Sequence, residues 1–216
     1  NSSVLLKNVD GTLPLPAGVN VAVVGDMAKV ARFQGSGSSK VNATREENLL
    51  DELTRTEGVN VAGYAQGYDR QGARNQGLID EAVALAGKAD VVVAVVGLDE
   101  RSESEGLDRS TMAIPQVQND MVDALVATGK PVVIVLIAGS PVELPWYAGV
   151  SAILYIGLSG QAGASATATL LRILLRNTLV SSWAAICWAS SSTSRFSRKR
   201  TLKRLSRMPS TLRWAL

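Results

Sequence analysis

The chain has 216 residues, of which 46% are hydrophobic and 19% charged, as in an ordinary globular protein with one sizeable core. It has one cysteine, Cys187, and no histidine, which excludes an internal disulfide, a Ser-His-Asp triad and a histidine-ligated metal site. The formal net charge is +3, but all 19 Asp and Glu lie within residues 1–170, so the two parts of the chain differ strongly in charge.

Short apolar runs alternate with helix-like segments over the first 171 residues. In chain order, the apolar runs predict strands at 19–24, 59–64, 90–96, 131–137 and 150–156. Between and after these strands, an apolar period near 3.6 predicts helices at 48–57, 78–89, 114–125 and 160–171. The runs at 90–96 and 131–137 are apolar almost throughout, which indicates strands buried on both faces.

These patterns predict an α/β fold, with a mostly parallel sheet of five to six strands and helices on both faces. Because crossovers between parallel strands are right-handed, the loops that follow such strands gather at one edge of the sheet. We therefore expect the loops after Val24, Val96 and Ile137 to form the functional edge of the domain.

The loop that follows the strand at 90–96 is crowded with carboxylates. Residues 102–109 read SESEGLDR, so two glutamates, an aspartate and an arginine lie within seven residues. Such a cluster can hold one carboxyl group protonated and another ionised, which is what glycoside hydrolysis requires. Taken without its context, the same sequence is also typical of a solvated loop with weak surface ion pairs.

Several motifs, in their order along the chain, resemble the C-terminal α/β-sandwich domain of glycoside hydrolase family 3, the β-glucosidase family. They are SSVLLKNVDGTLPL at 2–15, VNVAVVGDMA at 19–28, QGSGSSKV at 34–41, the acid loop at 102–109, PVVIVLIAGSPVELPW at 131–146 and GLSGQAGASATATLL at 157–171. The resemblance covers residues 1–171. It implies a domain of a retaining β-glycosidase that hydrolyses terminal β-linked sugars, with a carbohydrate substrate and without a cofactor or metal.

The resemblance assigns a role to the acid loop. It implies that Glu105 is the general acid/base of glycoside hydrolysis, with Glu103 as a competing candidate because this loop varies in length across the family. Asp108 and Arg109 are expected to pair with each other, and to position the loop or contact a sugar hydroxyl.

The Gly/Ser loop at 34–39 is a second candidate for contact with a sugar. Glycines allow a ligand to approach the backbone closely, and successive N–H groups can bind oxygen. The resemblance implies a rim loop of the sugar site, with substrate contacts from Gly35, Ser36, Gly37 and Ser38. A flexible turn without a ligand is the alternative interpretation.

Three other side chains near the strand ends have simpler interpretations. Asp26 follows the first predicted strand and Gly25, and it is expected in a turn or a helix cap. Trp146 and Tyr147 follow the fourth strand, and they are expected to pack against the domain and not to stack on a sugar ring.

One departure from the family is a missing domain. Family members carry a (β/α)8 barrel that supplies the nucleophilic aspartate, and this sequence contains no such barrel. We therefore expect the isolated chain to be inactive, to require the barrel as its partner, and to self-associate through the surface left uncovered.

The alternative function is a non-catalytic, flavodoxin-like α/β module that binds a nucleotide or another small ligand. A third interpretation is an interaction fragment that seeks a partner barrel.

The other departure is the C-terminal segment, where residues 171–216 contain 10 Lys and Arg, nine serines, three of the four tryptophans, and no Gly, Asp or Glu. We interpret residues 172–216 as a non-native, poorly ordered tail, produced by a frameshift or a truncated gene end. Its charge would attract polyanions, but we expect neither a specific nucleic acid nor a membrane as partner. No signal peptide and no membrane span are predicted, and the compartment stays open between cytoplasm and secretion.

Overall fold

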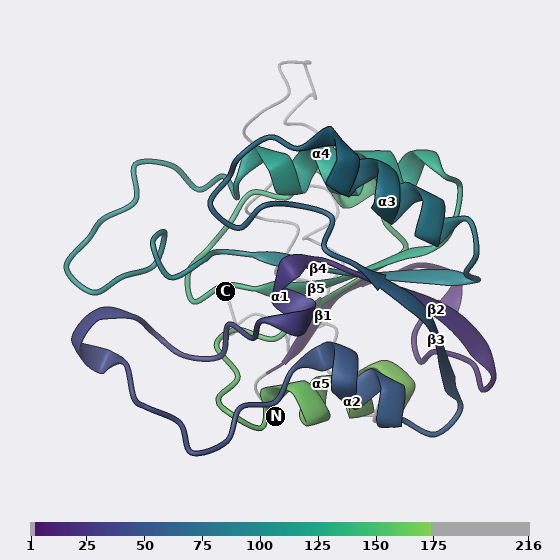
Figure 1. The fold of residues 1–216 in the computed structure, drawn as a ribbon, viewed down its shortest axis with the longest axis horizontal. Coiled ribbons are helices and arrows are strands. Elements are labelled where there is room, and N and C mark those ends of the chain that lie inside the picture. The colour runs from purple at the N-terminus through teal and green to yellow at the C-terminus, as the bar shows by residue number, and fades with distance from the viewer. Residues whose placement is uncertain (1–2, 174–216) are drawn as a thin grey trace, which may run out of the picture. The chain divides into compact units, whose positions relative to one another are not determined.

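The computed structural model describes residues 3–173, which form a six-stranded sheet with the strand order β1-β6-β5-β4-β2-β3 (Figure 1). Five of the strands run parallel, and β1 pairs antiparallel with β6 at one edge. The strands are β1 (Val4–Asn8), β2 (Val19–Val24), β3 (Val59–Ala65), β4 (Val91–Gly97), β5 (Val132–Ile137) and β6 (Ala152–Tyr155). The fold class predicted from the sequence is confirmed.

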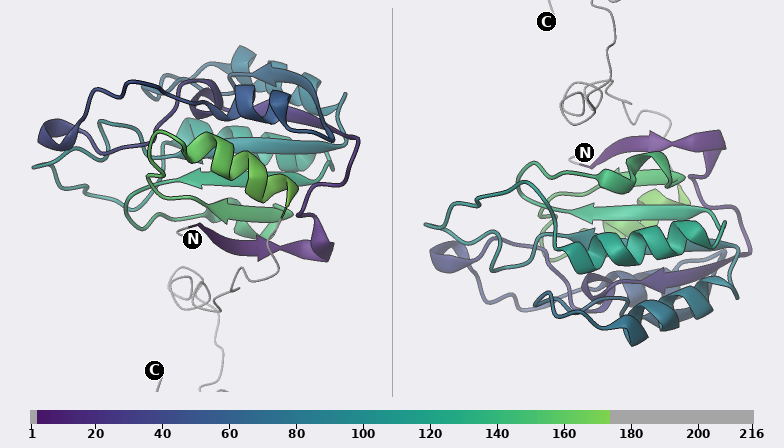
Figure 2. Two further views of the ribbon diagram at one scale, coloured as in Figure 1. Left: turned by 90° about the horizontal axis from the view of Figure 1, so that it is seen from below. Right: turned by 90° about the horizontal axis from the view of Figure 1, so that it is seen from above.

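Helices cover both faces of this sheet, so the domain has three layers (Figures 1 and 2). Helices α3 (Gln76–Ala86) and α4 (Gln116–Ala127) and the 3-10 turn η3 (Pro145–Ala148) pack on one face. Helices α1 (Asp26–Lys29), α2 (Leu49–Arg55) and α5 (Gly163–Arg172) pack on the other. Two further 3-10 turns are η1 (Val9–Gly11) and η2 (Gly37–Ser39).

The central strands owe their position to their composition. Every residue of β4 and β5 is buried, as expected for continuous Val, Ile and Leu runs that meet helices on both sides. Alternate residues of these strands enter the two apolar clusters that form the core, so each strand contributes to both. The five predicted strands are all present, with ends that differ by one or two residues.

Strand β1 is the element that the sequence analysis did not predict as a strand. Its residues, VLLKN, belong to the opening segment, and their register on β6 shifts between Leu5 and Lys7. The strand is held from outside the sheet as well, because Lys7 Nζ donates to the carbonyl oxygens of Tyr147 at 2.6 Å and Ala148 at 3.1 Å. It completes the sheet as a short antiparallel edge.

Local signals explain where several helices begin. The Asn48 side chain accepts a hydrogen bond of 2.9 Å from the Asp51 backbone N–H and so caps α2. Pro115 lies just before the first residue of α4, outside the helix, where its missing N–H costs nothing.

Within the described part of the chain, no helix is long and apolar enough to cross a membrane. The predicted tail at 172–216 falls almost entirely outside the described residues.

Two long segments extend from the carboxyl ends of β2 and β4 and project beyond the sheet at the same edge (Figure 1). The start of the second segment is fixed by Gly97, where a Cβ atom would lie 1.7 Å from the Ile137 carbonyl oxygen. The buried Gln118 side chain of α4 binds both the N–H and the carbonyl group of Gly97, at 2.8 and 3.0 Å. The acid loop therefore leaves a rigid strand end.

Candidate active site

The acid loop and the Gly/Ser loop pair with each other. Ser36 and Ser104 form an isolated parallel β-bridge, and the Glu105 backbone N–H donates to the Ser36 carbonyl oxygen at 3.2 Å. The Ser36 hydroxyl lies 2.7 Å from the carbonyl oxygen of Glu100 and 2.8 Å from that of Glu103. The predicted convergence of the loops after β2 and β4 is therefore present in the fold.

The loop after β5 joins them through the carboxylate of Glu103. The Gly139 backbone N–H donates to the two carboxylate oxygens at 2.9 and 3.0 Å, and the Ser140 hydroxyl donates at 2.5 Å. All three strand-end loops named in the sequence analysis thus meet at one place.

A hollow of about 740 Å³ lies among these loops. Six of the eight predicted site residues line it: Gly35, Ser36, Glu103, Glu105, Asp108 and Arg109. Gly37 and Ser38 lie beside the hollow in η2, and the Ser38 hydroxyl donates to the Glu105 carboxylate. A space of this size accommodates a small organic ligand such as a sugar unit.

The two candidate acids differ in how much of their hydrogen-bonding capacity is already used. The Glu103 side chain is only 12% exposed, and its oxygens accept from Gly139 and Ser140, as described above. Glu105 is exposed, and its side chain accepts from Ser38 alone among the described residues. Glu105 is therefore the glutamate whose carboxyl group is available to a ligand.

The expected pairing of Asp108 with Arg109 is wrong. No ion pair joins them in the structure of residues 3–173. Instead, Arg109 Nη2 donates to the Pro141 carbonyl oxygen at 2.7 Å, which ties the end of the acid loop to the segment after β5. Asp108 is exposed at the hollow, where its carboxylate is available to a ligand.

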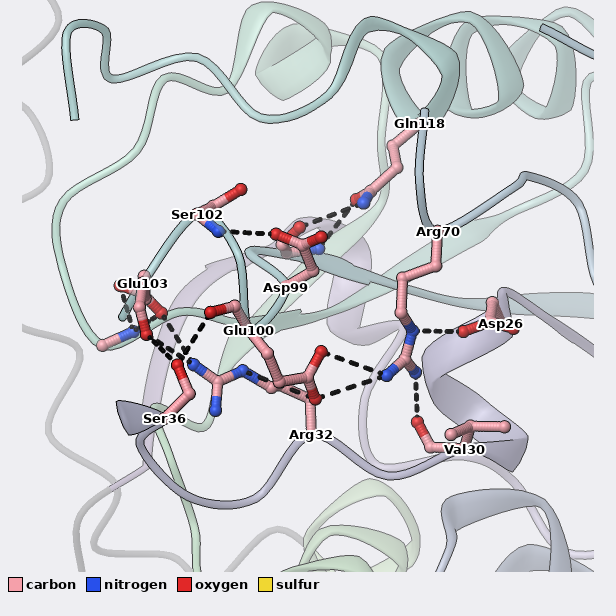
Figure 3. Close-up of polar contacts among 12 residues, drawn as sticks. Asp26, Val30, Arg32, Ser36, Arg70, Asp99, Glu100, Ser102, Glu103 and Gln118 are labelled. Carbon is pink, nitrogen blue, oxygen red and sulfur yellow. Dashed lines mark hydrogen bonds and ion pairs between the residues drawn. The ribbon is translucent and has the colours of Figure 1, made fainter. Parts of the chain in front are cut away.

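Two arginines that the sequence analysis did not identify contact the segment that follows β4 (Figure 3). Arg32 is only 3% exposed; its Nη2 donates to the Glu103 carbonyl oxygen at 3.3 Å, and its Nε lies 4.0 Å from Glu100 Oε1. Arg70 binds Asp26 at 2.5 Å and Glu100 at 3.4 Å. No sequence pattern marks them, because each lies in a loop, 71 and 30 positions from the residue it contacts.

Asp26, Trp146 and Tyr147 make structural contacts in the fold. Asp26, expected in a turn or a helix cap, is instead the first residue of α1, whose N-cap is Gly25, and it pairs with Arg70. Trp146 is 3% exposed and donates from Nε1 to Asn119 Oδ1 at 2.9 Å, while the Tyr147 ring lies 4.9 Å from Lys7 Nζ. Neither aromatic residue lines the hollow, so packing is their role here.

Tyr155 lies beside the segment that follows β5, and the pKa of its hydroxyl is raised. Burial is the larger cause of the raised pKa, and the charge of Glu103 raises it further. The hydroxyl donates to the Ala138 carbonyl oxygen at 2.8 Å, just before Gly139 and Ser140. Among residues 3–173, no group of three or more His, Cys, Asp or Glu is arranged to hold a metal ion.

The model of the glycosyl hydrolase family 3 C-terminal domain matches residues 3–173, which is most of the chain. The chain belongs to glycosyl hydrolase family 3. The matched region of this family 3 domain includes all six strands and the whole candidate site. The resemblance inferred from the motifs is confirmed.

Curated relatives of this family 3 domain are glycosidases. The chain is 40% identical over 173 residues to thermostable β-glucosidase B of Acetivibrio thermocellus, and the match covers 79% of this chain and 23% of the relative. It is 38% identical over 182 residues to an exo-α-(1→6)-L-arabinopyranosidase of Bifidobacterium breve, covering 79% and 24%.

A solved structure gives the same result. The family 3 β-glucosidase of Bifidobacterium adolescentis superposes with a TM-score of 0.73 and 39% identity, over 79% of this chain and 25% of that one. This chain thus spans about a quarter of the length of the relatives that it matches. In those proteins the domain is part of a longer polypeptide.

Proposed function

We propose that residues 3–173 are the acid/base-supplying domain of a retaining β-glycosidase that removes terminal β-linked sugars. The observation that carries the proposal is the contrast at the hollow, where Glu105 is exposed with one partner while Glu103 is engaged by two donors of the β5 loop. A general acid must reach its substrate, and only the exposed carboxyl group has that freedom.

The reaction takes two steps in this proposal. An aspartate of a barrel domain attacks the anomeric carbon, the bond to the leaving oxygen breaks, and Glu105 donates its proton to that oxygen. Glu105, now ionised, then removes a proton from water, whose oxygen attacks the anomeric carbon and displaces the aspartate. Such chemistry places the two carboxyl groups about 5–5.5 Å apart, so the hollow must face the barrel closely.

The remaining loop residues bind the sugar in this proposal. The exposed carboxylate of Asp108 accepts hydrogen bonds from sugar hydroxyls, as carboxylates do at sugar sites. Gly35 and Ser36 line the hollow from one loop, and Arg109 lines it from the acid loop while its Nη2 holds the Pro141 carbonyl oxygen. Ser38, through its bond to Glu105, holds the acid in place.

The nucleotide-binding alternative receives no support. The relatives that match are glycosidases, and the site presents carboxylates where a phosphate group would require N–H groups or cations. The relatives support a glycosidase, while the choice between glucose and arabinose units is assigned in this proposal to residues of the longer polypeptide.

A hybrid enzyme tests the proposal. Residues 3–173 replace the matching segment of thermostable β-glucosidase B, so that a barrel is present, and Glu105→Gln is compared with Glu103→Gln. Removing a general acid slows hydrolysis about 10²- to 10⁴-fold for substrates with a poor leaving group. The loss is much smaller for substrates whose good leaving group departs without a proton. We expect this dependence on the leaving group for Glu105→Gln.

The control variants decide the assignment. Glu143→Gln changes an exposed glutamate on the segment after β5 and should leave the rate unchanged. If Glu105→Gln matched this control, or if Glu103→Gln alone showed the leaving-group dependence, Glu105 would not be the acid/base.

A further inference from the structure

Arg32 is a buried cation beneath the acid loop. Its side chain is 1% exposed, so its guanidinium has lost nearly all contact with water. A buried charge is tolerated only with charged or hydrogen-bonding partners, and the partners of Arg32 all belong to one segment. They are the carbonyl oxygen of Glu103 at 3.3 Å, its carboxylate at 3.9 Å, and the carboxylate of Glu100 at 4.0 Å.

Glu103 connects this cation to the neighbouring loop. Its carboxylate accepts hydrogen bonds from the Gly139 N–H and the Ser140 hydroxyl. The same carboxylate also lies 3.9 Å from Arg32 Nη2 (Figure 3). Its backbone N–H donates to the Asp99 carbonyl oxygen at 3.2 Å. Every polar group of Glu103 therefore has a partner, and those partners come from the segments that follow β2, β4 and β5.

The ion pairs continue from Arg32 through Glu100 and Arg70 to Asp26 of α1. Glu100 is shared between Arg32 and Arg70, and Arg70 is anchored by Asp26 of α1 and by the carbonyl oxygen of Val30. The side chains of Arg70 and Asp26 are 12% and 16% exposed, whereas that of Glu100 is 42% exposed, so the network is shielded at its arginines and open to water at Glu100. The shielded pairs stabilise one arrangement more than separate surface pairs do.

We propose that Arg32 and Glu103 form a positioning pair that fixes the acid loop, and through it Glu105, against the loops after β2 and β5. This inference rests on the proposed function for the role of Glu105, but the pair itself is defined by its own contacts. Glu105 lies two residues beyond Glu103, and its N–H is bonded to Ser36, whose hydroxyl contacts the Glu103 carbonyl oxygen. Glu103 is a positioning residue and not an alternative acid.

Hydrogen–deuterium exchange of the 216-residue chain tests the pair without any activity. In Arg32→Gln and Glu103→Gln, the N–H groups of Glu103, Glu105 and Gly139 should exchange faster by on the order of tenfold, because local opening becomes easier. The N–H groups of β4 should exchange as before. Arg74→Gln is the matched control, since Arg74 is 81% exposed and pairs with Asp120 of α4, outside the acid loop.

A milder variant covers the case in which loss of a buried charge unfolds the chain. Ser140→Ala removes one donor to Glu103 and leaves Arg32 and both carboxylates intact. It should accelerate exchange in the same loop, by less than Glu103→Gln does. The proposal would be overturned if exchange in the acid loop stayed unchanged in all three variants. It would also be overturned if Ser140→Ala accelerated exchange in β4 as much as in the loop.

Steady-state kinetics of the hybrid enzyme separate a positioning role from a general loss of stability, because kcat and KM respond differently to the two. Misplacement of a catalytic group by about 1 Å costs up to about 10²-fold, so we expect Glu103→Gln to lower kcat about 10- to 100-fold with KM little changed. Arg32→Lys, which keeps the charge, should recover part of the loss suffered by Arg32→Gln. A parent hybrid that is inactive would contradict the proposed function and leave the exchange result standing.

Discussion

At the scale of single residues, the site is built from contacts between loops that are far apart in the sequence. Glu105 is presented by a bond to Ser36, and Glu103 is held by Gly139 and Ser140. These residue types were visible in the sequence, as was the edge at which they meet. The difference in exposure and hydrogen bonding between the two glutamates was not, because it depends on which carboxylate meets the N–H of Gly139.

The Gln118 side chain provides a residue-scale prediction. It is 1% exposed and satisfies the buried N–H and carbonyl groups of Gly97. Gln118→Ala leaves both backbone groups without partners, which should lower the free energy of unfolding by about 3 kcal/mol. Urea unfolding of the 216-residue chain measures this loss, with Gln116→Ala, an exposed glutamine two positions earlier, as the control. Equal stability of the two variants would contradict the role given to Gln118.

Arg32 and Arg70 mark the limit of prediction at this scale. A buried arginine is rare enough that sequence alone assigns such residues to the surface. The carboxylates that permit their burial, Glu100 and Glu103, come from another strand-end loop. Only the fold brings these charges together.

At the scale of elements, the sequence predicted the five parallel strands and four of the five α-helices of the described residues, but not the short helix α1. Continuous apolar runs at β4 and β5 gave the clearest signal, since a strand buried on both faces has no polar positions. Strand β1 lacked such a signal. Its five residues gain their strand conformation from pairing with β6, about 150 positions away, which no local pattern reveals.

The start of α5 gives a prediction about pH. Ala162 offers no side-chain cap, and Glu47 from the segment before α2 accepts from the Ser165 N–H at 3.2 Å instead. The hydroxyl and the N–H of Ser165 stabilise the ionised carboxylate, which holds the pKa of Glu47 below the usual 4.5. A depressed pKa means stability that is present above pH 4.5 and lost as the pH falls through the folded-state value.

Glu47→Gln should therefore lower the thermal midpoint near pH 7, and the difference from the parent chain should vanish at acidic pH. Glu46→Gln, at the exposed neighbouring position, is the control and should show no such pH dependence. Thermal unfolding followed by circular dichroism between pH 3 and 7 measures both. A midpoint difference that stayed constant across this range would contradict the capping role.

At the scale of the whole molecule, the family 3 match ends at residue 173, and the basic, glycine-free segment follows it. We maintain the proposal that this segment is a frameshifted or truncated gene end. Sequencing the encoding DNA around codons 165–180 tests it, and a one-base shift should restore an acidic segment containing Gly and Pro. If no shifted frame resembled the family, the segment would have to be explained as it stands.

We propose that the domain supplies only part of a catalytic site. The hollow presents the carboxylates of Glu105 and Asp108, while Glu103 is engaged by Gly139 and Ser140. The chain spans about a quarter of its relatives, and in our proposal the nucleophile is an aspartate of the barrel. We therefore expect no glycosidase turnover from the 216-residue chain alone, measured with an aryl β-glucoside, and turnover when the barrel is restored.

The most direct test of the acid/base assignment is azide rescue of Glu105→Gln in the hybrid enzyme. Without its base the variant should accumulate the glycosyl ester of the barrel aspartate, because water is no longer activated. Azide, which needs no base and enters where the carboxylate charge was, should attack the anomeric carbon, displace the aspartate and release a β-glycosyl azide. Recovery of rate with that product, seen for Glu105→Gln and not for Glu103→Gln, is the predicted result. Rescue of Glu103→Gln alone would contradict the account.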